Sequence, residues 1–294
     1  MTRIYVDPLD YWDGEENLGA AQLGYWDGET WTEMDPLLYI PRGYQDVASM
    51  LAQPMVYIAH RGGSAEYPEH SRRGYTQAAI EGFGALEFSA ARTSDGVIIG
   101  CHDATIDRVV EGGGSFPPVS QMTWAQIQQQ MVKPPDTHPE RAPEPFIRIE
   151  QLIADYGSTH LIVFDPKSIS PTHYPQILAL MDANGGPSRW IGKWVGSNAA
   201  WSTALRSRGY KSWGAYYSTD DRSMVTGSQA QWDVLGFNFG GSAPQEDWDF
   251  ILSFGKRVWC HVAPTQGDVD TGVSKGATGA MVSGTEAVDV YKVY

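Results

Sequence analysis

Eight short apolar runs recur along the chain from residue 55 onward, and they constrain its fold more than any other feature. The runs are MVYIAH (55–60), ALEFSA (85–90), HLIVFD (160–165), WIGKWV (190–195), SWGAYY (212–217), VLGFNF (234–239), RVWCHV (257–262) and GAMVSG (279–284). Segments long enough for helices separate them, among them 72–82, 146–156 and 173–183. Strands that alternate with helices predict a parallel sheet. Because eight strands close a barrel, we predict an α/β fold of the (β/α)8, or TIM-barrel, type.

The first 45 residues differ from the rest of the chain. The pentapeptide YWDGE occurs at 11–15 and again at 25–29, and Pro36 and Pro41 follow it. Asp-Gly between aromatic residues favours a tight hairpin turn. We therefore expect an aromatic-rich N-terminal extension over residues 1–45 and a barrel domain over 46–294. The extension is either an arm packed on the main domain or an element for attachment or sugar binding, since aromatic rings also stack on ligands.

A hairpin and a long excursion interrupt the alternation after the second run. DGVIIGCHD, at 95–103, reads as a hairpin arm that extends the second strand. The stretch 104–145 contains EGGGSFPP and KPPDTHPERAPEP, and its proline content disfavours regular structure through much of its length.

Composition excludes several classes of function. The formal net charge is −14, and the 21 Lys and Arg residues form no basic run, so nucleic acid and anionic membranes are not expected partners. No stretch approaches the length of a membrane span, and the start, MTRIYVDPLDYWDG, lacks the apolar segment of a secretory signal. Cys101 and Cys260 are interpreted as buried apolar residues. Cys101 and the adjacent His102 point to opposite faces of a strand, which disfavours a thiol nucleophile.

Unusual polar residues follow the predicted strands. His60 and Arg61 end the first strand, His102 and Asp103 end the hairpin arm, and Asp165 and Lys167 end the third strand. In a barrel of this type the carboxyl ends of the strands carry the functional side chains. Alternation places Glu87 and Ser89 of the second strand on the same side. Charged groups inside a barrel are costly unless they are paired or bound to a metal.

These residues carry a resemblance to a known family. The segments are HRG at 60–62, PEHS at 68–71, LEFSAARTSDGVIIGCHDATIDR at 86–108 and DPK at 165–167. They resemble the glycerophosphodiester phosphodiesterase family, whose pattern is His-Arg-Gly, Pro-Glu-Asn-Thr, Glu-x-Asp, Thr-x-Asp-Gly, His-Asp and Glu-x-Lys. The likeness extends over roughly 55–285, where VWCHVAP and GATGAMVSG also match.

The resemblance implies a TIM-barrel hydrolase with a divalent cation, Mg²⁺ or Ca²⁺, and two histidines as general acid and base. Carried over residue by residue, His60 and His102 would be that pair, Arg61 a phosphate contact, Lys167 a stabiliser of developing charge, and Glu87 and Asp165 metal ligands. Ser89 would stand at a further metal position. We also expect Glu69 to hold Arg61 in place and Trp259 to contact the substrate. The substrate would be a small-molecule phosphodiester or a glycerol-phosphate polymer, cleaved by the neighbouring glycerol hydroxyl through a cyclic phosphate. Imidazole suits both proton transfers near neutral pH.

Three departures from the family pattern leave a second function open. Ser89 stands where the family has Asp, Asp165 where it has Glu, and PEHS where it has Pro-Glu-Asn-Thr. The alternative is a barrel without turnover that serves as a binding or structural module. Because Trp-Asp-Gly-x-x-Trp hairpins resemble segments of bacteriophage tail proteins, a virion tail assembly is one such setting. His261 faces either the barrel mouth or a neighbouring helix, and His70, His138, His160 and His173 are read as packing or surface residues.

Overall fold

The computed structural model describes residues 5–6, 23–26, 31–34, 42–238 and 243–291. The chain divides into two compact units, residues 1–41 and 42–294. The first contains an antiparallel sheet in the order β1 (Tyr5–Val6), β2 (Leu23–Trp26) and β3 (Trp31–Met34). The register pairs Trp26 with Trp31, so the second YWDGE copy begins in a hairpin strand, as predicted. The connection at 27–30 and the first copy at 11–15 lie outside the described residues.

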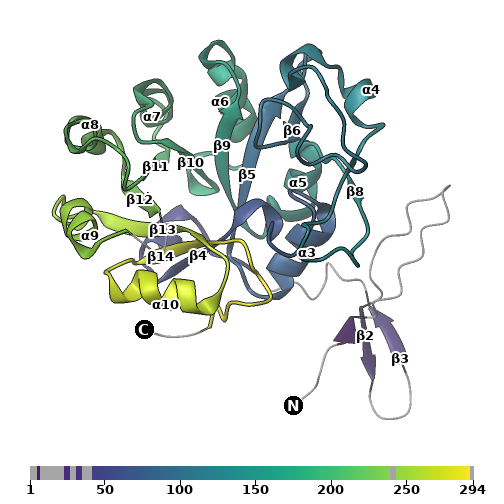
Figure 1. Cartoon of the computed structure of the whole chain (residues 1–294), viewed down its shortest axis with the longest axis horizontal. Helices are drawn as coiled ribbons and strands as arrows, with labels where there is room; N and C mark the ends of the chain where they lie inside the picture. Colours follow the sequence, from purple (N-terminus) through teal and green to yellow (C-terminus); the bar gives the residue numbers. More distant parts are fainter. Residues whose placement is uncertain (1–4, 7–22, 27–30, 35–41, 239–242, 292–294) are drawn as a thin grey trace. The chain divides into compact units, whose positions relative to one another are not determined.

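Eight parallel strands of the second unit form a closed barrel (Figure 1). They are β4 (Val56–Ala59), β5 (Ala85–Arg92), β9 (Leu161–Ser168), β10 (Trp190–Val195), β11 (Lys211–Tyr216), β12 (Val234–Asn238), β13 (Arg257–Ala263) and β14 (Gly279–Val282). The order is β4-β14-β13-β12-β11-β10-β9-β5, and β4 also pairs with β5, which closes the sheet. Each predicted run overlaps one of these strands, so the barrel prediction is confirmed.

Helices surround the strands on the outside (Figure 1). They are α3 (Arg72–Ile80), α5 (Ile149–Tyr156), α6 (Tyr174–Ala183), α7 (Ala199–Arg206), α8 (Arg222–Ser228), α9 (Gln245–Leu252) and α10 (Gln266–Ser274). Short 3-10 turns in the connections are η1 (His60–Gly62), which directly follows β4, η3 (Pro171–His173), η4 (Gly186–Ser188) and η5 (Gln229–Gln231). Their burial follows helical spacing: α5 buries Ile149, Leu152 and Tyr156 on one face. In the part of the chain that the structure describes, no helix is long and apolar enough to cross a membrane.

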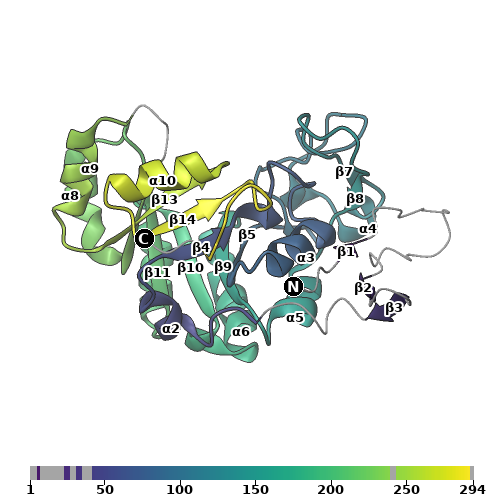
Figure 2. The same ribbon diagram turned by 90° about the horizontal axis from the view of Figure 1, so that it is seen from below.

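The barrel interior is apolar at its amino-terminal end. The residues that pack there include Val56, Ile58, Ala85, Leu161, Val163, Ile191, Trp213, Val234, Trp259 and Met281. Helix α2 (Val47–Leu51), which the sequence analysis missed, adds Val47 and Met50 to this cluster and lies below the strand starts (Figure 2). A capping box between Asp46 and Ser49 begins the helix. Because this end is filled with apolar side chains, the polar residues gather at the other end.

The hairpin and the excursion also follow the prediction. β6 (Ile98–Gly100) pairs antiparallel with the end of β5. The regular elements that follow are short: η2 (Val119–Gln121), α4 (Trp124–Ile127), β7 (Met131–Val132) and β8 (Glu144–Pro145). The excursion has an apolar cluster of its own, which includes Ile106, Val109, Val110, Val119, Met122, Ile127 and Val132, and Cys101 packs into it.

Candidate active site

Two buried carboxylates face each other across neighbouring strands at the carboxyl end of the barrel. Glu87 of β5 and Asp165 of β9 are both fully buried. Ser89 is paired with Asp165 in the strand register, and its hydroxyl donates a hydrogen bond of 2.7 Å to Oε1 of Glu87. The predicted shared orientation of Glu87 and Ser89 is therefore confirmed.

Lys193 of β10 lies between these two carboxylates. Its Nζ is 2.6 Å from Oδ2 of Asp165 and 3.2 Å from Oε1 of Glu87. Burial lowers the pKa of Lys193, but Asp165 and Glu87 outweigh it and hold the pKa above its usual value. Burial likewise acts to raise the pKa of Glu87, and Lys193 with other nearby groups keeps it well below its ordinary range. The cluster is thus an ammonium between two carboxylates.

Sequence reasoning missed Lys193, although the chain carries a signal for it. The run WIGKWV places a lysine two residues after Ile191, which packs in the barrel interior. Since alternate strand residues share a face, Lys193 points inward as well. A charged residue at an interior position indicates a buried partner.

Lys167 is the second cation of this cluster. It follows Asp165 by two residues on β9, and its Nζ is 3.5 Å from Oδ2 of Asp165. The same ammonium lies 4.8 Å from the centre of the Trp194 ring. Burial lowers the pKa of Lys167, and the Asp165 carboxylate acts in the opposite direction. Two lysines and two carboxylates therefore share a small space, and their formal charges cancel.

The residues predicted to hold a metal do not fit a divalent cation in this arrangement. Both oxygens of Glu87 accept hydrogen bonds, Oε1 from Ser89 and Lys193 and Oε2 from the backbone N–H of Arg61 at 3.1 Å. Asp165 keeps one unpartnered oxygen, Oδ1. Mg²⁺ takes six oxygen ligands and Ca²⁺ six to eight, and waters can supply several of them. The Lys193 ammonium nevertheless lies between the two carboxylates, where such an ion would have to bind. Residues 42–238 and 243–291 contain no group of three or more His, Cys, Asp or Glu able to hold a metal ion.

The loop after β4 positions His60 and Arg61. Arg61 has a φ of 51° and His70 a φ of 58°, both in the left-handed region. Asn and His tolerate this region better than most residues, which explains how PEHS can replace Pro-Glu-Asn-Thr. The Arg61 guanidinium is 2.9 Å from Oε1 of Glu69, the support expected of Glu69. His60 is buried and hydrogen-bonded through Nδ1 to Ser64 at 2.9 Å.

His102 follows β6 and is the more open of the two predicted catalytic histidines. Its side chain is 30% exposed, and its Nδ1 lies 2.6 Å from Oδ1 of Asp103. A carboxylate only accepts hydrogen bonds, so Nδ1–H donates and Nε2 is left for another partner. Burial and the Arg61 charge lower the pKa of His102, whereas the hydrogen bond to Asp103 raises it. Burial and Arg61 place the pKa of His60 well below its usual value.

A continuous charged network connects the loops of the two histidines. Arg108, which sequence reasoning also missed, donates to Oδ2 of Asp103 at 2.6 Å. It donates to both oxygens of Glu69 at 2.9 and 3.0 Å. The chain of contacts therefore runs from His102 through Asp103, Arg108 and Glu69 to Arg61. It ties the start of the excursion to the loop that carries His60.

Trp259 is not where the prediction placed it. It is fully buried in the barrel interior and packs edge-on against Trp213, with ring centroids 5.2 Å apart. Trp259 lies near the start of β13, below the mouth of the barrel, so it packs in the core and does not reach the substrate. The prediction that it binds substrate is therefore wrong. His261 shares its inward face closer to the barrel mouth and packs edge-on against Tyr217 at 5.4 Å. Burial lowers the pKa of His261 to about 3.

The remaining reactive side chains have structural roles. His70 is buried, with Nδ1 2.7 Å from the hydroxyl of Tyr75. His160 is buried beside Thr159, and His138 contacts Glu140 near the surface. Burial raises the pKa of Cys101 to about 12, so it is an inert thiol near neutral pH, as predicted.

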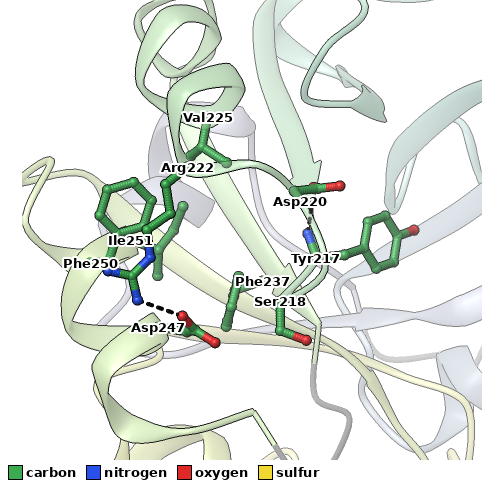
Figure 3. Close-up of a pocket in the computed structure, with 9 residues that line it drawn as sticks. All are labelled: Tyr217, Ser218, Asp220, Arg222, Val225, Phe237, Asp247, Phe250 and Ile251. Atoms are coloured by element: carbon green, nitrogen blue, oxygen red, sulfur yellow. Dashed lines mark hydrogen bonds and ion pairs between the residues drawn. The ribbon is translucent and has the colours of Figure 1, made fainter.

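A cavity of about 240 Å³ adjoins the network between the His60 loop and the excursion. It is lined by Ser64, Tyr67, Glu69, Arg108, Val109, Lys133, Pro134, Pro135 and Asp136. A second hollow, near Tyr217 and the start of α8, holds only about 30 Å³, enough for a water molecule (Figure 3). The 2.7 Å ion pair between Arg222 and Asp247 crosses it. Of these two hollows, the first has the size of a small organic group.

Residues 60–182 match the model of the glycerophosphoryl diester phosphodiesterase family. The chain is 37% identical over 95 residues to glycerophosphodiester phosphodiesterase 1 of Rattus norvegicus, covering 32% of this chain and 27% of that protein. It is 39% identical over 80 residues to a probable glycerophosphodiester phosphodiesterase 1 of Mycobacterium tuberculosis, covering 27% of this chain and 28% of that protein. These alignments span about a quarter of each curated relative.

Solved structures share the barrel over most of its length. A putative glycerophosphoryl diester phosphodiesterase from Silicibacter pomeroyi superposes with a TM-score of 0.65 at 18% identity, covering 86% of this chain and 95% of that one. An Oleispira antarctica phosphodiesterase in complex with the product sn-glycerol-3-phosphate gives a TM-score of 0.62 at 14% identity, covering 82% and 97%. At these identities the likeness establishes the fold.

Proposed function

We propose that this chain, a member of the glycerophosphoryl diester phosphodiesterase family through residues 60–182, hydrolyses glycerophosphodiesters or polymers built from glycerol phosphate. The observation that carries the proposal is the charged network that joins His102 to the loop of His60 at the carboxyl end of the barrel. In a barrel of this type that end is where active sites lie.

The two imidazoles differ in the way that an acid and a base require. The pKa of His60 lies well below its ordinary value because of burial and Arg61, so His60 is neutral and can accept a proton. His102 is less buried, and the hydrogen bond to Asp103 offsets part of the fall in its pKa. His102 is therefore the better proton donor of the pair. Its Nδ1–H is held by Asp103, so the transfer would occur at Nε2.

The proposed reaction has two steps. A hydroxyl next to the phosphate loses its proton to His60 and attacks phosphorus, while His102 gives a proton to the departing alcohol oxygen. The cyclic phosphate that forms is opened by water, which loses a proton to His102 as the first hydroxyl regains its own from His60. Each histidine thus returns to its starting state.

Arg61 and Lys167 supply positive charge to the phosphorane. The Nε of Arg61 is buried and has no hydrogen-bond partner among the described residues, so this donor is free for a phosphoryl oxygen. Lys167 is 15% exposed and lies toward the open end of its cluster. Donors that are fixed before the reaction stabilise charge that develops in the transition state. The 240 Å³ cavity beside Glu69 and Arg108 would receive the alcohol.

The resemblance also implied Mg²⁺ or Ca²⁺, and members of this family generally use a divalent cation. The steps above are carried by side chains of this chain alone, since the residues expected to bind the ion do not fit one. The role of Glu87 and Asp165 is instead to hold Lys193 and Lys167 in place.

A turnover assay tests the function directly. The purified protein should release choline from glycerophosphocholine, or glycerol phosphate from short glycerol-phosphate oligomers. If no such diester is cleaved by the wild type and Ser89→Asp restores cleavage, the alternative of a non-catalytic module, for example in a virion tail, is favoured.

The pH profile of kcat/KM is expected to peak on the acid side of pH 6.5. The pKa values of His60 and His102 are both lowered from the usual 6.5. As the pH rises above the pKa of His102, the acid loses the proton that it must donate, so activity falls. Measurement of kcat/KM over the pH range in which the protein stays folded gives both the acidic and the alkaline limb of this profile. Asp103→Asn should move the alkaline limb to lower pH, because the contact with Asp103 raises the pKa of His102. An optimum well above pH 7 would contradict this assignment.

A further inference from the structure

We propose that the ammonium group of Lys193 takes the place of a divalent cation in this active site, so that the chain acts on phosphodiesters without a bound metal. The catalytic half of this inference rests on the function proposed above. The exclusion of a metal is a property of the folded chain and can be measured without any substrate.

Three neighbouring strands bring the charges together. The register of β5, β9 and β10 sets Ser89 beside Asp165 and Gly192 beside Phe164, so Lys193 is level with Asp165. The side chains of Asp165 and Lys193 both point inward. As a result, Nζ of Lys193 is 2.6 Å from Asp165 and 3.2 Å from Glu87, between the two carboxylates that would otherwise bind an ion.

The hydrogen bonds of the cluster leave little room for a competing cation. An ammonium has three N–H donors. Two of those on Lys193 go to Glu87 and Asp165, and the third is available for a phosphoryl oxygen or a hydroxyl. A divalent ion at the same place would have to displace this ammonium or lie against it. The side chain is only 6% exposed, so it cannot swing into solvent without a change in the barrel wall.

Ser89 fits the same arrangement. Its hydroxyl donates to Glu87. An aspartate there would bring a third carboxylate to a cluster that has two ammonium groups, so one negative charge would be left unbalanced. With Ser89, the carboxylates of Glu87 and Asp165 balance the ammonium groups of Lys193 and Lys167. The serine that departs from the family pattern and the buried lysine are therefore two parts of one site.

Titration with Mn²⁺, followed by electron paramagnetic resonance and calorimetry, tests the exclusion of metal. The wild-type protein is expected to show no saturable, stoichiometric Mn²⁺ site. The double variant Lys193→Met with Ser89→Asp supplies three carboxylates and no ammonium between Glu87 and Asp165, and should gain a saturable Mn²⁺ site at least about 10-fold tighter than any weak Mn²⁺ binding by the wild type. The matched control, Lys167→Met with Ser89→Asp, has the same change in charge but keeps Lys193, and should gain no such site.

Turnover tests the catalytic half. Wild-type activity should be unchanged after chelation with EDTA, and Lys193→Met should lower kcat by about 10²-fold without rescue by Mg²⁺ or Ca²⁺. Stoichiometric Mn²⁺ binding by the wild type, or loss of its turnover on chelation, would overturn the proposal, and both measurements stand even if the variants fail to fold. A protein that cleaves no diester would refute the proposed function, while the Mn²⁺ titration would still decide the occupant of the site.

Discussion

Replacement of His102 by alanine is expected to lower kcat for a glycerophosphodiester by about 10²-fold or more, up to 10⁴-fold. The side chain is the proposed proton donor to the departing alcohol, and water cannot occupy its place with the same orientation. Because the side chain of His102 is 30% exposed, its loss should leave the folded barrel intact. Steady-state kinetics at the pH optimum, with the unfolding midpoint of each protein, measure both effects.

His138→Ala is the matched control for this experiment. His138 also contacts a carboxylate near the surface, that of Glu140 at 2.9 Å, but it lies outside the charged network. The His138→Ala variant should retain the kcat of the wild type. A His102→Ala protein that keeps its turnover within a few-fold of the wild type would exclude the proposed acid.

Replacement of Glu87 by glutamine should lower the free energy of unfolding by roughly 3–5 kcal/mol, the usual cost of removing one partner from a buried ion pair. Glutamine keeps the shape of the side chain but removes the charge that faces Lys193. It also turns one oxygen into an NH₂ donor, which then faces the N–H of Arg61 or the ammonium of Lys193. Denaturant unfolding, with comparison of midpoints and slopes, gives the change.

Asp182→Asn serves as the control for charge removal at the surface. Its ion pair with Arg208 is about 40% exposed on both sides, and such pairs contribute little to stability. Equal losses in the Glu87 and Asp182 variants would mean that the buried cluster does not contribute as the geometry indicates.

Most of the barrel could be predicted because each of its strands has a local signal in the sequence, a short run of apolar residues. Each run of apolar residues forms one strand, and alternation within a run correctly gave the shared orientation of Glu87 and Ser89. Helix α2 was missed because it is only five residues long, and its burial depends on strand residues far along the chain. Short helices of this kind are stabilised by packing rather than by their own propensity.

The site was less predictable wherever partners come from distant segments. Arg108 is an ordinary arginine in the sequence, and only the fold of the excursion brings it to Glu69 and Asp103. Trp259 was assigned from a motif, but the depth of a residue along a strand decides whether it meets substrate or core. Lys193 could have been found from its position, because it is a charged residue within the apolar run WIGKWV.

The left-handed backbone conformation of Arg61 and His70 limits the thermal stability of this fold. Such a conformation costs a non-glycine residue roughly 1–2 kcal/mol, and glycine adopts it freely. We therefore expect a screen for thermostable variants to select Arg61→Gly. Arg61→Gly would remove the guanidinium that contacts Glu69 and faces the proposed phosphate. The same substitution would therefore raise thermal stability and lower turnover.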